Sequence, residues 1–100
     1  QTASALMRGL PDYLVLWQGR AYWYEIKAIT GRKSFNFSAF TAAQMVEFKQ
    51  MLVQGGVDVQ IGVYNKDAEL YVLPFSAVLA AMLQGCNSLE LIFYKIDINL

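Results

Sequence analysis

Two runs of apolar residues that flank a short turn, over residues 9–27, constrain this chain more than any other stretch. Each run has the composition of a strand, and Gly19-Arg20 between them is typical of a turn, so the sequence predicts a β-hairpin. Strand alternation places Trp23, Glu25 and Lys27 on one face of its second strand. An apolar hairpin therefore carries a carboxylate and an ammonium side by side.

These two charges imply a partner. Burying an unpaired charge costs several kcal/mol or more, and nothing in the packing of a hairpin requires it. A further carboxylate, Asp12, opens the first strand, and the predicted hairpin brings it toward Glu25. A divalent cation would satisfy both carboxylates. A solvent-exposed Glu/Lys pair on an edge hairpin is the structural alternative.

A hard cation suits this donor set. Mg²⁺ prefers oxygen ligands in octahedral geometry and keeps several waters. Asp12 and Glu25 offer two carboxylates, and the carbonyl of Ile26 can add a third oxygen. Lys27 is then placed to hold an attacking water or the phosphate being cut. This combination indicates metal-assisted hydrolysis of a phosphodiester.

The spacing Pro11-Asp12, twelve residues, Glu25-Ile26-Lys27 resembles the PD-(D/E)XK nuclease superfamily. Further motifs follow in the order seen in RecU-type Holliday junction resolvases, and the similarity covers roughly residues 8–80. The compact VRR-NUC nuclease domains are a second relative by the same criteria. The motifs are Asp12-Tyr13, Gly19-Arg20, Tyr24-Glu25-Ile26-Lys27-Ala28, Ser34-Phe35-Asn36-Phe37, Gln44, Gly55-Gly56 and Tyr71-Val72-Leu73-Pro74.

The resemblance implies a restriction-endonuclease-like fold and a Mg²⁺-dependent endonuclease, with Mn²⁺ as a substitute, that acts on branched DNA such as a four-way junction. It implies catalytic roles for Asp12, Glu25, Lys27 and Gln44. Gln44 also has a structural explanation, because Thr41-Ala42-Ala43-Gln44 has the pattern of a helix capping box. A flap or general nuclease of VRR-NUC type, and a catalytically silent DNA-binding module of the same fold, are the alternatives.

Composition bounds the remaining expectations. A length of 100 residues predicts one domain over residues 1–100. No apolar run approaches the roughly 20 residues that span a bilayer, and the single cysteine, Cys86, suits the reducing cytoplasm. The lack of histidine excludes His-based triads. Hydrophobic residues make up 56% of the chain, which predicts either a well-filled core or a homodimer interface, with the aromatic segment 35–40 as its main contributor.

The net charge is zero, but the basic residues are concentrated in the first half. Residues 1–49 hold six basic and three acidic side chains, and local basic density is what phosphate contacts need. We expect Arg8, Arg20, Arg32 and Lys33 to line the approach to the metal, although the 30–34 loop also fits an ordinary solvated turn. Hairpin aromatics either stack on unpaired bases or pack across the strands.

The rest of the chain alternates strands and helices. Residues 35–40 fit a short strand or an extended segment that covers the core, and a helix follows to about Gln54. Strands are expected over 57–64, 68–73 and 88–94, with a second helix from Ser76 to Gln84. This order predicts an α/β or α+β fold with a mixed central sheet flanked by helices.

Overall fold

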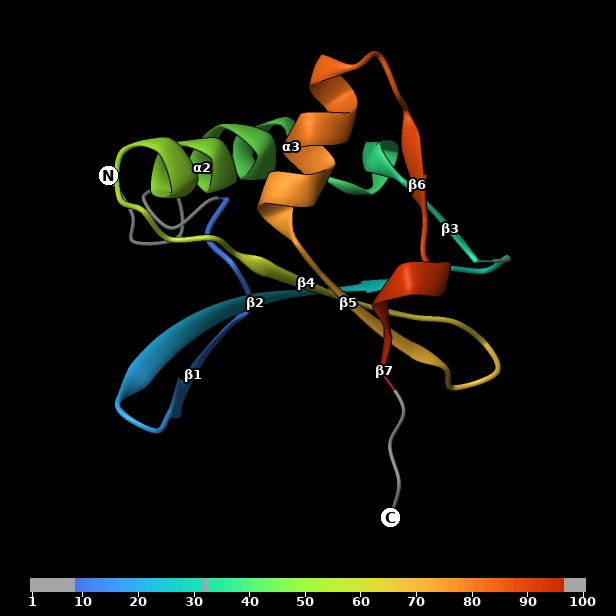
Figure 1. Cartoon of the computed structure of the whole chain (residues 1–100), viewed down its shortest axis with the longest axis horizontal. Coiled ribbons are helices and arrows are strands. Elements are labelled where there is room, and N and C mark those ends of the chain that lie inside the picture. Colours follow the sequence, from blue (N-terminus) through green and yellow to red (C-terminus); the bar gives the residue numbers. More distant parts are fainter. Residues whose placement is uncertain (1–8, 32, 97–100) are drawn as a thin grey trace.

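The computed structural model describes residues 9–31 and 33–96. Its main element is a five-stranded sheet in the order β1-β2-β4-β5-β7, with β2 and β4 parallel and the other neighbours antiparallel. The strands of this sheet are β1 (Tyr13–Trp17), β2 (Arg20–Ala28), β4 (Gln60–Tyr64), β5 (Leu70–Pro74) and β7 (Lys95–Ile96). The predicted α+β class with a mixed sheet is confirmed (Figure 1).

The predicted hairpin is present as β1 and β2, paired from Tyr13 opposite Tyr24 to Trp17 opposite Arg20. Its turn is one residue earlier than expected. Gln18 and Gly19 form it with φ of 49° and 77°, and two positive φ values match the right-handed twist of the flanking strands. Arg20 is the first residue of β2, so it pairs in the ladder instead of belonging to the turn.

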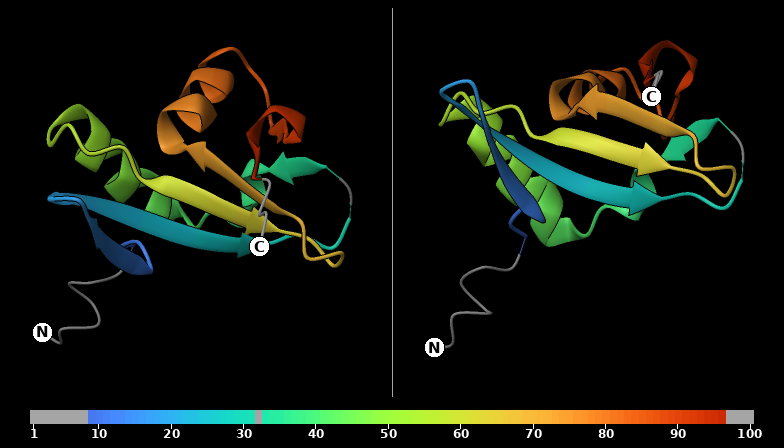
Figure 2. Two further views of the ribbon diagram at one scale, coloured as in Figure 1. Left: turned by 60° about the horizontal axis from the view of Figure 1, so that its bottom comes forward. Right: turned by 90° about the horizontal axis from the view of Figure 1, so that it is seen from below.

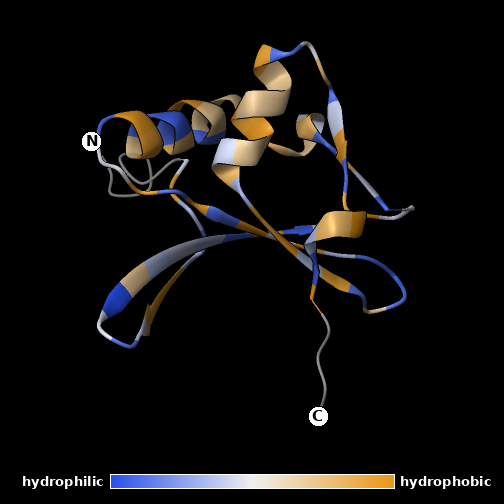
Figure 3. Ribbon diagram, in the orientation of Figure 1, coloured by the Kyte–Doolittle hydropathy of each residue, from blue (hydrophilic) through white to orange (hydrophobic). Residues whose placement is uncertain are grey.

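Two helices cover one face of the sheet: α2 (Ala42–Val53) and α3 (Phe75–Leu83). Figure 2 shows both on the same side of β2, β4 and β5. Alternate residues of β4 and β5 point at them, and Ile61, Val63, Tyr71 and Leu73 are fully buried there. The apolar character of α3 is visible in Figure 3, and its Val78 contributes to the same core.

The aromatic segment 35–40 belongs to this core, which corrects its expected place in a dimer interface. It forms β3 (Ser34–Asn36) and the 3₁₀ turn η1 (Phe37–Ala39). Phe35 is completely buried, and Phe37 and Phe40 are each 7% exposed. Phe40 makes edge-to-face contacts with Phe35, Phe48 and Phe75, with ring centroids 5.5–5.9 Å apart. These aromatic side chains are therefore not available to a second protomer.

The last third of the chain departs from its predicted boundaries. The strand expected over 57–64 begins only at Gln60, and the strand expected over 88–94 ends at Glu90. This short strand, β6 (Ser88–Glu90), pairs with β3 in a separate two-stranded sheet. The 3₁₀ turn η2 (Ile92–Tyr94) then redirects the chain so that β7 can pair with β5. An apolar run alone does not reveal such a change of sheet.

Gly9 allows the chain to pass close to α2 just before the hairpin. Its φ is +88°, and a Cβ at this position would lie 2.6 Å from the carbonyl oxygen of Ala43. Only glycine is compatible with both the backbone conformation and the contact. The segment that leads to Asp12 is thereby placed beside the first turn of α2.

Candidate active site

Strand β2 carries the two charged residues of the candidate site on the face that looks toward the helices. Glu25 is 3% exposed, and the side chain of Lys27 is 15% exposed. The predicted shared face is therefore confirmed. Glu25 Oε2 and Lys27 Nζ form an ion pair at 3.2 Å, so a charged pair lies at the margin of an apolar core.

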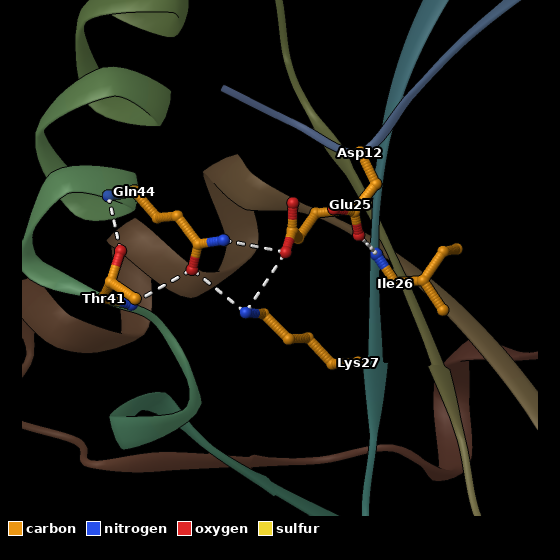
Figure 4. A network of polar contacts seen from close by, with 6 residues as sticks. All are labelled: Asp12, Glu25, Ile26, Lys27, Thr41 and Gln44. Carbon is orange, nitrogen blue, oxygen red and sulfur yellow. Dashed lines mark hydrogen bonds and ion pairs between the residues drawn. The ribbon is translucent and has the colours of Figure 1, made fainter. Parts of the chain in front are cut away.

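Gln44, in the first turn of α2, joins this pair (Figure 4). Its Nε2 donates to Glu25 Oε2 at 2.8 Å, and its Oε1 accepts from Lys27 Nζ at 3.0 Å. The three side chains form a closed ring of polar contacts between a strand and a helix. The sequence left open whether Gln44 caps the helix or belongs to the site, and the structure shows that it caps α2 and also contacts Glu25 and Lys27.

The capping box is complete. The Thr41 hydroxyl accepts from the backbone N–H of Gln44 at 3.0 Å, and the Thr41 N–H donates to Gln44 Oε1 at 3.0 Å. Gln44 Oε1 thus accepts from Thr41 and from Lys27 at once. Thr41 was predicted as a helix cap, but its connection to the charged pair was not, because sequence spacing along a helix does not show which strand lies opposite.

Glu25 carries the clearest electrostatic signature of the site. Its pKa is raised above the ordinary 4.5, chiefly because burial disfavours the charged form, and Lys27 partly opposes this. Its Oε1 is buried and has no hydrogen-bond partner among the described residues. A buried carboxylate oxygen without a donor is costly. A bound cation or ordered water would remove that cost.

Asp12 lies just before β1, and the hairpin brings it beside β2. Its Oδ2 accepts from the backbone N–H of Ile26 at 3.1 Å. The contact of Ile26 with Asp12 is therefore through its amide, and a role for its carbonyl as a metal ligand stays a prediction. Asp12 is near enough to Glu25 to help raise its pKa. The hairpin thus brings Asp12 close enough to act on the Glu25 carboxylate, and this approach of the two residues is what the sequence predicted.

The available donors suit a hard cation with an incomplete protein shell. In the part of the chain that the structure describes, no group of three or more Asp, Glu, His or Cys side chains is arranged to hold a metal. Asp12 and Glu25 supply two carboxylates. Mg²⁺ commonly binds one or two carboxylates and completes its octahedron with water and substrate phosphate, so the residues present fit this ion.

Phe40 is a contact of Lys27 that the sequence did not predict. Lys27 Nζ lies 5.5 Å from the centroid of the Phe40 ring, within the range of a cation–π contact. The ring itself is held by the core aromatics. The alternation in 35–40 indicated aromatic packing but gave no signal of a charged neighbour.

Of the four basic residues predicted along the approach, the two that the structure describes, Arg20 and Lys33, do not lie beside Glu25. Arg20 begins β2, five residues from Glu25, which corresponds to about 17 Å along a strand. Lys33 lies beyond the other end of β2, in a pocket shared with Asn65 and Glu69. Arg8 and Arg32 fall outside the described residues. A direct role for these cations in DNA binding remains a prediction.

Comparison with known proteins adds one finding. The sequence model of the family RecU, described as Recombination protein U, matches residues 2–95. No curated protein matches the chain. Within the described ranges, no helix combines the length and apolar character needed to cross a membrane.

Proposed function

The chain belongs to the RecU (Recombination protein U) family, and on this basis we propose that it is a metal-dependent, structure-selective DNA endonuclease that resolves four-way junctions. Family membership carries a recombination role. Metal dependence, junction cleavage and the residues that perform it are our proposal, and a flap or general DNA nuclease is the alternative within the same chemistry.

The observation that carries the proposal is the state of Glu25. One oxygen of its carboxylate is held by Lys27 and Gln44, whereas Oε1 is buried without a hydrogen-bond partner in the described part of the chain. A fold gains nothing from a half-satisfied buried carboxylate. A cation held by Glu25 and Asp12 would give this carboxylate the partner that it lacks.

Mg²⁺ or Mn²⁺ would be held by Asp12, Glu25 and the Ile26 carbonyl, and when bound it supplies Lewis acidity and stabilises the charge that develops on the phosphate. Lys27 is the one cation within bonding distance of Glu25 in the described structure. Its Nζ carries hydrogens that can be donated to an attacking water or to a phosphate oxygen. We assign it the role of orienting the nucleophile.

Gln44 fixes the orientation of these two groups, which form an ion pair at 3.2 Å. By donating to Glu25 Oε2 and accepting from Lys27 Nζ, it adds to the contacts of Oε2 and leaves Oε1 without a hydrogen-bond partner among the described residues. The carboxylate can then bind a cation on one side while the ammonium remains directed by the amide on the other.

We propose a homodimer, with β1 in place of the 35–40 segment as its contact. β1 is an edge strand of the described sheet, and all five of its side chains are 41–75% exposed although all are apolar or aromatic. Together these side chains expose on the order of 500 Å² of surface. A stable dimer buries about 800 Å² per partner. Antiparallel pairing of two copies of β1 would centre the twofold axis on Val15. Two paired sites suit the two cuts that a junction requires.

The experiment that tests the proposal is a cleavage panel. The protein is incubated with Mg²⁺ or Mn²⁺ and with four-way junction, flap, duplex or single-stranded DNA. We expect junction cleavage that disappears with chelator and in Asp12→Asn, while the exposed control Asp67→Asn retains it. Preferred cleavage of flaps would favour the alternative nuclease, and DNA binding without any cleavage would show a silent module and overturn the proposal.

A further inference from the structure

The side-chain amide of Gln44 lies between three groups that dictate its orientation. Thr41 N–H and Lys27 Nζ both donate to Oε1, each at 3.0 Å, and Nε2 faces the acceptor Glu25 Oε2 at 2.8 Å. A backbone N–H can only donate. The Thr41 amide therefore requires an oxygen at this end of Gln44, which leaves the NH₂ end for Glu25.

We propose that Thr41 is a positioning residue of the site, and that its backbone N–H holds the Gln44 amide in the orientation needed by both Glu25 and Lys27. This inference rests on the proposed nuclease function. It assigns to the N-cap of α2 a role beyond starting a helix, because the donor that completes the capping box is also the donor that orders the charged pair.

The rest of the junction between η1 and α2 supports this role. A glutamine side chain has three rotatable bonds, and the Thr41 contact ties its far end to the backbone. The preceding residue, Phe40, lies beneath Lys27 Nζ at 5.5 Å and is fixed among core aromatics. Phe40 and Gln44 thus contact the charged pair from one short segment, so the pair is positioned by the start of α2 as well as by its own strand.

The backbone permits an unusually direct test. Thr41 has φ −75° and ψ 161°, and Phe40 before it has φ −83° and ψ 141°. Both suit a proline at position 41, and the N-cap of α3 is itself a proline, Pro74, with φ −75° and ψ 148°. Thr41→Pro therefore removes the N–H together with the hydroxyl while the local conformation is kept. Thr41→Val removes only the hydroxyl, and Thr41→Ser keeps both groups.

We expect Thr41→Pro to lower kcat for junction cleavage about tenfold and to weaken Mn²⁺ binding in calorimetry by a similar factor, as is usual when a residue that supports a metal ligand is lost. The KM for DNA should not change. Thr41→Val should lose much less of kcat and of Mn²⁺ affinity, and Thr41→Ser should match the wild type in both. In a Gln44→Ala background, Thr41→Pro should cost no more than Thr41→Val does, because the effect of the lost N–H passes through the Gln44 side-chain amide.

Equal losses in Thr41→Pro and Thr41→Val would overturn the inference, as would a full tenfold loss from Thr41→Pro in the Gln44→Ala background. If Thr41→Pro does not fold, hydrogen exchange of the Thr41 amide decides. It should be about tenfold faster in Gln44→Ala than in the wild type, and equal exchange would refute the contact. A wild type that neither cleaves DNA nor binds Mn²⁺ would refute the proposed function, whereas the exchange result would still report on Thr41 alone.

Discussion

Replacing Lys27 by methionine should destabilise the fold in a manner that depends on pH. Methionine keeps the aliphatic part of the side chain beside Phe40 but removes the ammonium. Glu25 then loses its ion pair at 3.2 Å and retains the Gln44 amide as its donor among the described residues. A buried carboxylate without a counter-charge is the expected source of the instability.

The magnitude follows from the burial of the pair. Removing one partner of a fully buried ion pair costs about 3–5 kcal/mol. Lys27 is partly accessible and Gln44 still donates to Glu25, so we expect about 2–3 kcal/mol at pH 8. For a domain of this size, about 4–8 °C of Tm corresponds to each kcal/mol. The variant should therefore melt about 10–20 °C lower.

The pH dependence has a definite sign. The pKa of Glu25 is already raised above 4.5 by burial, with Lys27 opposing the rise, so Lys27→Met should raise it further. A group with a raised pKa in the folded state contributes stability that is present below its unfolded pKa and is lost as pH rises through the folded value. The difference in Tm between wild type and variant should therefore be small at pH 4 and large at pH 8.

Thermal unfolding followed by circular dichroism at pH 4 and pH 8 provides the assay. The double variant Glu25→Gln with Lys27→Met removes both charges and should recover most of the Tm lost at pH 8. An equal loss of Tm at the two pH values would refute the reasoning, because it would show that uncompensated charge on Glu25 is not the cause. A double variant no more stable than Lys27→Met would refute it as well.

Three further predictions concern other surfaces. The pKa of Glu69 is lowered to about 2, chiefly by the Asn65 amide, so the contribution of Glu69 to stability is present above pH 4.5 and is lost as pH falls toward 2. Glu69→Gln should therefore flatten the decline of Tm between pH 4.5 and 2. An unchanged decline would contradict this. Arg20→Ala with Lys33→Ala should reduce the slope of log K against log salt for DNA binding by about two. An unaltered slope would show that neither side chain contacts a DNA phosphate. Sedimentation equilibrium should show a dimer at micromolar concentration that Leu16→Glu converts to the 11.3 kDa monomer, and a wild type that is monomeric with and without junction DNA would contradict the dimer.

The hairpin and the first helix could be predicted from sequence because their signals are local. Alternation alone places Glu25 and Lys27 on one face of β2, and the Thr41 to Gln44 spacing is sufficient for a capping box. The RecU resemblance was likewise carried by short motifs in order, and the family match confirms it.

What could not be predicted depends on contacts between distant segments. The aromatic residues of 35–40 read equally well as core or as interface, and only the position of Phe75 and Phe48 shows that Phe40 is enclosed. Proximity in sequence also gives no measure of the distance between Arg20 and Glu25, because the residues between them extend along one strand. The strand expected over 88–94 divides between two sheets, which no periodicity within it reveals.

The most direct test of the central claim, that the hairpin carboxylates hold a catalytic cation, is calorimetric titration of Mn²⁺ into the wild type, Glu25→Gln and the exposed control Glu90→Gln. We predict that the wild type and Glu90→Gln bind the ion with the same affinity and that Glu25→Gln binds it at least tenfold more weakly, by the usual effect of losing a metal-site group. Equal affinity of all three proteins for Mn²⁺ would contradict the account.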